Sequence, residues 1–471
     1  MNIDLEKCVD LIAGAIQWAF IVAMFSLASC NRYQSMPLTE QAIRSALTMP
    51  SLNRLKIRAE AIGHRFQQRV GFDLRDGLSP DEAAILAVLM NPILKVVRDQ
   101  QDIAEAQLLQ AGILPNPTLS YSLETPVGGS TAGTVTAYGI GVSWNITSLI
   151  SRTAKIDAAA ANNKDVKLSV AWQEWQIAQA ARAAVYRLLV LNYQVELGSL
   201  FEQHLSKNLQ DFRQAMSRGL VTELELAAAA ASRNTAHNRV LSLVQKQVQQ
   251  TLKLKQALGI PNDYPVELQA DIELPDHIET PPADRMSRDV EHQRLDILAF
   301  RQGYASQEAA VRTAVLEQFP KISIGPDYAR DNGNVVGLGF GISINLPIFD
   351  RNQGKVAIAR ASRQQLFDEY ISRIYQARAN ITQLAANIRS LNKLLRSMQS
   401  SIPQQSILVE SYRRGVNLGQ ADVLSYYQAW NQLINFRIQR LSLSRRLIEN
   451  RIALELATGL YCAEGTRQCF Q

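Results

Sequence analysis

The sequence predicts a mixed α and β protein in which β-hairpins are joined to very long helices, with this unit occurring twice. Three observations predict it. Four segments alternate large apolar residues with small or polar ones, and long proline-free stretches are rich in strong helix formers. In addition, the pattern of residues 139–146 recurs 200 residues later, at 339–346. A period this long indicates tandem duplication of a domain-sized unit rather than a solenoid.

The first pair of strands is expected within residues 118–146. Residues 118–124 alternate at every step, and from Tyr138 to Ile146 large apolar side chains alternate with glycine, serine and asparagine. The intervening residues 126–130 (Pro-Val-Gly-Gly-Ser) have the composition of a turn. We therefore expect an antiparallel hairpin here.

The second pair of strands is expected within residues 320–346, with a turn at Asp331–Asn334. A period of two places apolar groups on one face of a sheet and small or polar groups on the other. In a transmembrane barrel these faces would meet lipid and lumen, whereas in a soluble sheet the apolar face would be buried. No segment after residue 29 is long and apolar enough for a transmembrane helix, which favours the barrel.

Long helices are expected after each hairpin. The stretch from Arg152 to Ser217 would make a helix of roughly 100 Å at 1.5 Å per residue. Apolar residues spaced three and four apart, as at Val185, Leu188 and Leu189, indicate that the helices pack along one another as coiled coils. Because no globular core requires helices this long, a bundle, a fibre or a helical barrel is expected.

Each helical stretch is interrupted once, and the interruptions predict the tips of two helical hairpins. We place them at Arg218–Gly219 and at Arg414–Gly415, because glycine after a basic residue is a helix C-terminal signal. Thr222 is expected to cap the following helix, and Asp422 to lie in the first turn of its own helix. Both tips would lie farthest from the strands.

The start of the first repeat is indicated by Ser79, Pro80 and Glu82, which have the composition of a capped helix start. We therefore divide the chain into a signal peptide (1–29), an N-terminal extension (30–78), a first repeat (79–260), a proline-rich linker (261–283), a second repeat (284–460) and a C-terminal tail (461–471).

The N-terminus resembles a bacterial lipoprotein signal. Residues 11–29 are apolar and uncharged, and the segment ends in Leu-Ala-Ser followed by Cys30, which would become the acylated first residue of the mature chain. An uncleaved membrane anchor is the alternative, since 19 residues can span a bilayer. The acidic residues before position 11 argue against a secretory signal, which normally starts basic.

After Cys8, within the expected signal peptide, and Cys30, two cysteines remain, both in the C-terminal tail. Cys462 and Cys469 are close in sequence, and a pair in an oxidising compartment is expected to form a disulfide that closes a small loop. Two free thiols are the alternative. A redox or zinc motif is excluded by the spacing, because six residues separate the pair.

Several functional classes are disfavoured by the sequence. The net charge of +6 comes from Lys and Arg residues spread among nearly as many acids, so no clustered nucleic-acid footprint is present. The five histidines are scattered, and no glycine-rich loop ends in Gly-Lys-Ser or Gly-Lys-Thr. We therefore expect no enzyme activity, no cofactor, no metal site and no nucleic-acid partner.

The order of elements resembles that of the TolC family of outer-membrane efflux proteins over nearly the whole mature chain. The marks that carry the resemblance are Leu114–Leu119 entering the first strand, Leu346–Asp350 leaving the fourth, Tyr412–Gly415 with Asp422–Leu424 at the second tip, and Ala457–Gly459 at the end of the second repeat. One departure from the family pattern is the loop between Gly415 and Asp422, which looks slightly longer than usual.

This resemblance implies a homotrimer in which four strands from each protomer form a twelve-stranded barrel, continuous with a periplasmic barrel of helices. Four strands cannot close a barrel, since about eight is the practical minimum. It also implies tips that contact a periplasmic adaptor (membrane fusion) protein through Arg218, Gly219, Thr222, Arg414 and Gly415. The resemblance makes Tyr412, Arg414 and Asp422 candidates for a polar network that keeps the tip closed.

The function expected from these features is that of a passive exit duct in the bacterial outer membrane. The duct would be lipid-anchored, with helices extending into the periplasm, and would receive substrate from an inner-membrane pump through the adaptor. The alternatives are a soluble coiled-coil structural or adaptor protein and the outer-membrane component of a protein secretion system. The sequence does not identify the exported substrate.

Overall fold

The computed structural model describes residues 33–61 and 72–460. The expected signal peptide, the acylation site Cys30 and the cysteine pair Cys462 and Cys469 lie outside the described residues.

The chain divides into two compact units, Met1–Met49 and Pro50–Gln471. In the first unit, the described residues include the short helix α2 (Glu40–Leu47), whose N-cap Thr39 accepts a hydrogen bond from the backbone N–H of Ala42. All of the remaining elements belong to the second unit.

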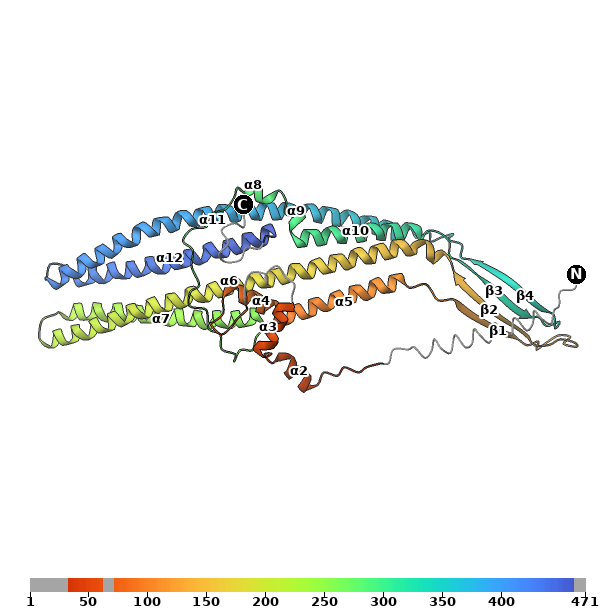
Figure 1. Ribbon diagram of the computed structural model, residues 1–471, viewed down its shortest axis with the longest axis horizontal. Coiled ribbons are helices and arrows are strands. Elements are labelled where there is room, and N and C mark those ends of the chain that lie inside the picture. The colour runs from red at the N-terminus through yellow and green to blue at the C-terminus, as the bar shows by residue number, and fades with distance from the viewer. Residues whose placement is uncertain (1–32, 62–71, 461–471) are drawn as a thin grey trace. The chain divides into compact units, whose positions relative to one another are not determined.

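The second unit confirms the predicted combination of two β-hairpins with very long helices (Figure 1). Its elements are α3 (Leu52–Ala61), α4 (Pro80–Met90), α5 (Pro92–Gly112), β1 (Thr118–Glu124), β2 (Ala137–Asn145), α6 (Thr147–Ser217), α7 (Glu223–Leu258), α8 (Ala283–Ser287), α9 (Val290–Gln293), α10 (Leu295–Leu316), β3 (Ile322–Arg330), β4 (Val336–Ile344), α11 (Gln353–Asn417) and α12 (Val423–Thr458). In the part of the chain that the structure describes, no helix combines the length and the apolar character needed to cross a membrane.

The four strands form one antiparallel sheet in the order β1-β2-β3-β4. One row of the sheet shows the register: Tyr121 lies opposite Ile140, Ile140 opposite Tyr328, and Tyr328 opposite Leu338. Strand β4 begins at Val336, two residues after the turn expected at Asp331–Asn334. The turn before it is tight, because the side chain of Asp331 accepts a hydrogen bond from the backbone N–H of Val335.

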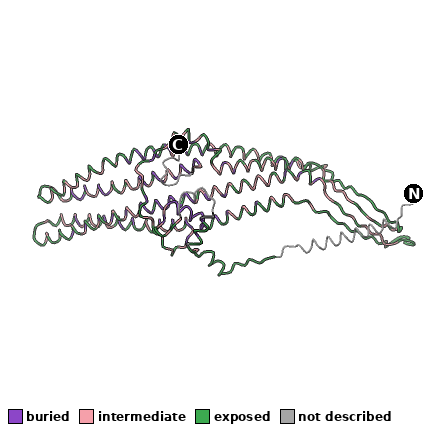
Figure 2. Tube along the Cα trace, viewed as in Figure 1, coloured by how far each residue is buried: buried purple, intermediate pink, exposed green. Residues whose placement is uncertain are grey.

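The sheet has one apolar face and one face of small or polar residues, as the alternation predicts. The apolar face of β4 is well exposed, with Leu338 at 70% and Phe340 and Ile342 at 65% of full exposure. Figure 2 shows the strands as largely exposed, whereas buried residues gather midway along the long helices. The sheet therefore presents an uncovered apolar surface within the protomer.

The two long helices that follow the hairpins contain 71 residues (α6) and 65 residues (α11). At 1.5 Å per residue they are about 107 Å and 98 Å long. Each turns back into a 36-residue helix, α7 or α12. Helices of this length are stabilised mainly by packing against one another rather than by intrinsic propensity.

The helix whose start was expected at Ser79–Glu82 ends at Met90, and a second helix follows after Asn91. This residue ends α4 and caps α5, its side-chain oxygen accepting a hydrogen bond from the backbone N–H of Ile93 at 2.9 Å. Pro92 lacks the N–H that would continue α4 and fits the first position of a new helix. All of α4 is buried, so it forms the centre of the helical region.

Positions 200 residues apart occupy comparable places near the ends of α7 and α12. Gly259 and Gly459 both have positive φ, at 71° and 77°, and both end their helix. A side chain at Gly259 would collide with Asn91, while one at Gly459 would collide with Gln293. Each helix end is thus pressed against the junction that precedes α5 or α10.

Candidate functional site at the helical tips

The first tip follows the sequence prediction. Helix α6 ends at Ser217, and Gly219 takes the left-handed conformation at φ 71°. Thr222 then caps α7: its hydroxyl oxygen accepts a hydrogen bond from the backbone N–H of Glu225 at 3.2 Å. In return, the Glu225 carboxylate accepts one from the backbone N–H of Thr222 at 2.8 Å. This reciprocal capping box fixes the direction in which the chain enters α7.

The second tip lies four residues beyond the predicted position. Helix α11 continues through Arg414 and Gly415 to Asn417, and it is Gly419, at φ 67°, that takes the left-handed conformation. Gly419 stands 200 residues after Gly219. Gly415 therefore lies inside the helix, and the two tips of this chain have matching lengths.

Gly415 has a different role, which is to allow a close approach. A Cβ atom at this position would stand 2.8 Å from the Cβ of Ala421, closer than two such carbons pack. The helix can therefore pass directly beside the tip loop, whose Gln420 donates its backbone N–H to the carbonyl oxygen of Gly415 at 2.8 Å.

Asp422 is the N-cap of α12 rather than a residue of its first turn. Its carboxylate accepts hydrogen bonds from the backbone N–H groups of Leu424 and Ser425, at 3.2 and 3.1 Å. These two bonds lower the pKa of Asp422. The bond from the backbone N–H of Thr222 likewise lowers the pKa of Glu225, and the nearby charge of Asp422 opposes that shift. The charge of Asp422, at the second tip, thus affects the pKa of Glu225 at the first tip.

The three gate candidates do not form a polar network within the described protomer. Both carboxylate oxygens of Asp422 are engaged in the cap. Arg414 is 67% exposed and lies 3.9 Å from the Glu410 carboxylate, which pairs more closely with Arg413 at 2.8 Å. Tyr412 packs against the apolar cluster beneath the tips.

That cluster joins the two hairpins. Its aromatic members include Phe201 from α6 and Tyr426 and Trp430 from α12, with the Phe201 and Trp430 rings 5.4 Å apart and edge-on. Buried residues of α7 complete the cluster, and partly buried residues of α11 pack against it. Edge-on aromatic pairs add about 0.5–1.5 kcal/mol beyond their buried area. The tips therefore rest on a shared core rather than on two separate coiled coils.

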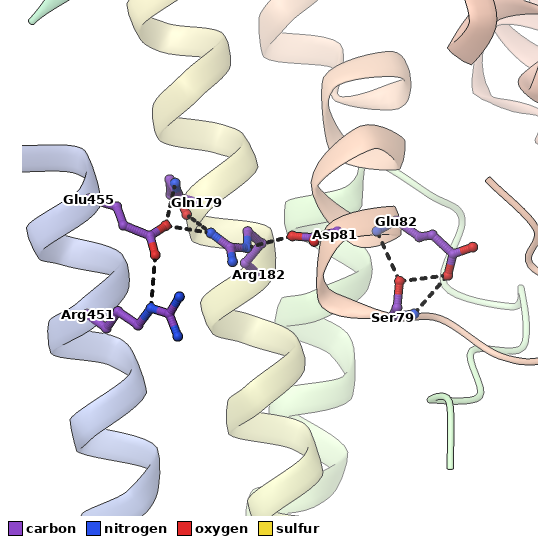
Figure 3. A network of polar contacts seen from close by, with 7 residues as sticks. All are labelled: Ser79, Asp81, Glu82, Gln179, Arg182, Arg451 and Glu455. Carbon is purple, nitrogen blue, oxygen red and sulfur yellow. Dashed lines mark hydrogen bonds and ion pairs between the residues drawn. The ribbon is translucent and has the colours of Figure 1, made fainter. Parts of the chain in front are cut away.

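A buried ionic network ties three helices together in the middle of the helical region (Figure 3). Arg182 of α6 lies between two carboxylates: its Nε is 3.0 Å from Asp81 of α4, and its Nη1 is 2.8 Å from Glu455 of α12. Gln179 accepts a hydrogen bond from Arg182 at 3.0 Å, and Arg451 donates one to Glu455 at 3.2 Å. Burial raises the pKa of Glu455, and the charges of Arg182 and Arg451 oppose that shift.

Comparison with known proteins finds a protein family that matches part of the chain. Residues 287–460 match the family model described as "Outer membrane efflux protein". The chain is 23% identical over 388 residues to the cobalt-zinc-cadmium resistance protein CzcC of Cupriavidus metallidurans, an alignment that covers 77% of this chain and 86% of CzcC.

Two solved structures show the same fold at low sequence identity. One is CusC, described in terms of transmembrane channel formation, with a TM-score of 0.69 and 18% identity, covering 84% of this chain and 96% of CusC. The other is the outer membrane protein VceC of Vibrio cholerae, with a TM-score of 0.68 and 17% identity, covering 81% of this chain and 96% of VceC.

Proposed function

Because the chain belongs to the TolC family of outer membrane efflux proteins, we propose that it is the outer-membrane exit duct of a tripartite efflux system. Proteins of this family are channels rather than enzymes. In this proposal three protomers form a passive channel, and the energy for transport comes from an inner-membrane pump that is reached through a periplasmic adaptor. The matching 200-residue offsets are those expected of a duplicated unit.

The observation that carries the proposal is the open, two-faced sheet. Four strands leave β1 and β4 as edges, each with one hydrogen-bonded neighbour in the protomer. The exposed apolar face would cost free energy in water but not against lipid, whereas the other face is suited to an aqueous lumen. Pairing β4 of one protomer with β1 of the next removes both edges. Three copies would then supply twelve strands.

An unpartnered apolar stripe on α7 also supports assembly with further copies. Leu241, Val244, Val248 and Leu252 are spaced three or four residues apart along one face of the helix, and they are between 37% and 54% exposed. A stripe of this kind is expected to pack against a different surface of a neighbouring copy. Such head-to-tail contacts close into a ring when the rotation between copies allows it.

The tips offer a surface for the adaptor. They expose Leu220 at 72%, Leu224 at 80% and Leu418 at 70%, beside the predicted contact residues Arg218 and Gly219. Exposed leucines at the end of a helical hairpin suit an apolar face of another helical hairpin. Within this proposal Arg414, which is exposed and weakly paired in the protomer, is available to contact a neighbouring protomer and hold the tips closed.

Two further parts of the proposal concern attachment to the membrane and the exported substrate. Acylation of Cys30 would anchor each protomer to outer-membrane lipid, and mass spectrometry of the mature N-terminus tests it, since an unmodified chain beginning at Met1 would exclude acylation. The similarity to CzcC makes divalent metal cations the first substrate class to test. A metal-sensitivity assay in a host that lacks its own exit duct would serve.

The two rival functions make different demands on the sheet. A soluble coiled-coil adaptor has no use for an exposed apolar face on four strands, and it would be extracted without detergent. A protein secretion duct would share the barrel, and it differs in its partner. Co-purification with an adaptor would support the efflux function, whereas co-purification with a protein-translocating transporter would support the secretion function.

The experiment that tests the proposed function combines channel recording with adaptor binding. Purified protein in planar bilayers is expected to give discrete conductance steps. Leu224→Asp should abolish co-purification of the adaptor and leave the conductance in place, because Leu224 is an exposed residue outside the sheet and is not one of the gate candidates. Glu223→Gln, one residue away, is the matched control and should retain the adaptor. Absence of any conductance from correctly assembled protein would refute the proposal.

A further inference from the structure

The small-residue face of the sheet carries carboxylates and no cation. Its members follow from the register and the alternation of the strands. Among the strand residues on this face, the charged side chains are Asp327 of β3 and Glu124 of β1, and six of the others are glycines: Gly139, Gly141, Gly325, Gly337, Gly339 and Gly341. The two carboxylates are therefore the charged groups of a strand surface that otherwise carries small or polar side chains.

The glycine opposite Asp327 leaves room for its carboxylate. Its register partner on β4 is Gly339, where a Cβ atom would stand 2.8 and 2.9 Å from the two Asp327 carboxylate oxygens. The carboxylate thus lies across the neighbouring strand in space that any other residue at position 339 would occupy. The carboxylate therefore lies close to the backbone of β4.

The backbone immediately before Asp327 is unusual for an inner strand. Pro326 lacks a backbone N–H, and pairing between β2 and β3 is interrupted at Gly325 and Pro326. A Cβ atom at Gly325 would collide with the carbonyl oxygen of Val142. Proline and glycine in a strand interior mark a local irregularity that can re-aim the next side chain.

Asp327 has no ion-pair partner in the described part of the chain. The nearest basic residue of its strand, Arg330, has the opposite parity and lies on the apolar face. There its guanidinium stacks 4.9 Å from the Tyr138 ring and donates a hydrogen bond to the carbonyl oxygen of Thr136. The charge of Asp327 is therefore directed to the space in front of the small-residue face.

We propose that Asp327 is a specificity-determining residue of the channel, giving its lumen a preference for cations, with Glu124, the last residue of β1 at the end of the sheet, as a weaker second contributor. The inference rests on the proposed function, because it requires the small-residue face to line a lumen. Three copies of each carboxylate would then face one water-filled space. Asp327 and Glu124 lie opposite Gly141 and Ala137 of β2, so the two levels are about 13 Å apart at roughly 3.3 Å per residue.

The physical effect is attraction without a binding site. Rings of carboxylates raise the local concentration of cations in a pore and lower that of anions. The glycine wall leaves the lumen wide, so ions keep their hydration and pass without being trapped. Because salt screens such charges within about 10 Å at 0.1 M and about 3 Å at 1 M, the preference should weaken as the salt concentration rises.

The test is the zero-current potential of single channels in planar bilayers under a KCl gradient, starting from 0.1 M. Wild type should give the sign of cation preference. Asp327→Asn should move the potential toward zero, Glu124→Gln should move it less, and Asp327→Glu should retain it. Asp331→Asn is the matched control, because it removes one charge at the hairpin turn while its amide oxygen can still accept the hydrogen bond from Val335.

The outcomes separate this inference from the proposed function. Channels whose potential is the same in wild type, Asp327→Asn and Asp327→Ser would overturn the inference and leave the exit duct intact. An equal shift in Asp331→Asn would also overturn it, since the effect would then reflect net charge rather than position. Assembled protein that conducts no ions at all would instead refute the proposed function.

Discussion

Arg182 and Glu455 are 273 residues apart in the sequence, yet the Arg182 guanidinium donates a hydrogen bond to the Glu455 carboxylate at 2.8 Å. The Glu455 side chain is completely buried, and that of Arg182 is 3% exposed. The contact joins α6 to α12, and Asp81 extends it to α4. The middle of the helical region is thus fixed by charges that are paired inside the protein.

Loss of Arg182 should destabilise the fold strongly. Arg182→Ala would leave Glu455 and Asp81 buried without their shared cation, and breaking a buried pair in this way costs about 3–5 kcal/mol. Denaturant unfolding followed by circular dichroism measures the change. Arg187→Ala is the control: Arg187 pairs with Glu449 but is 46% exposed, so its loss should cost no more than about 1 kcal/mol. Equal effects of the two substitutions would contradict the assigned role.

The role of Asp422 can be separated into cap and charge. Asp422→Ala removes the cap of α12 and should cost about 1 kcal/mol locally, whereas Asp422→Asn keeps a capping oxygen and should be nearly neutral. Hydrogen exchange at the first turn of α12 reports the stability, and closed-state conductance reports the gate. If Asp422→Asn opens the channel while exchange is unchanged, the charge acts as a gate beyond its cap.

Acid should loosen both tips. The pKa values of Asp422 and Glu225 lie below their ordinary values of 3.8 and 4.5, because each carboxylate accepts backbone hydrogen bonds. A depressed folded-state pKa means that the stabilisation is present above the ordinary value and is lost as the pH falls through the depressed one. Amide protection at the starts of α7 and α12 should therefore decline below about pH 4. In Asp422→Asn the decline at α12 should disappear, and protection independent of pH in wild type would argue against these caps.

The two glycines of the second tip should respond differently to substitution. Gly419→Ala forces alanine into the left-handed conformation, at a cost of about 1–2 kcal/mol. Gly415→Ala brings two Cβ atoms to 2.8 Å, and the crowding should outweigh the gain of about 1 kcal/mol in helix propensity. The double substitution Gly415→Ala with Ala421→Gly removes the clash and should restore tip stability, measured by hydrogen exchange. A failure of this rescue would show that Gly415 is needed for another reason.

The strands and the long helices could be predicted because their signals are local. Alternation located β1 on its exact residues and the other strands within about two residues, since each step of a strand reverses the side chain. The end of α11 was misplaced because two glycines, Gly415 and Gly419, compete as the stop signal. The 200-residue offset from Gly219 was the information that could have decided between them.

The buried network and the shared tip core could not be predicted in the same way. Arg182 and Glu455 look like residues of solvated helix faces, and only the packing of helices far apart in the chain shows that they are buried. Tyr426, Tyr427 and Trp430 do follow helical spacing, which indicates an apolar face, but the sequence does not identify the helices that cover it. The gate candidates came from resemblance alone, and within the described protomer Asp422 acts as a helix cap while Tyr412 packs against the apolar cluster.

In the proposed channel, the open sheet is completed by other copies of the chain. The most direct test is the molar mass of the protein extracted in mild detergent, with the detergent contribution subtracted. A mass of three times that of the mature chain, which is at most 52.4 kDa, is the predicted result. A monomer that stays in solution without detergent would rule out this assembly, because the apolar face of the sheet would then have neither lipid nor a partner to cover it.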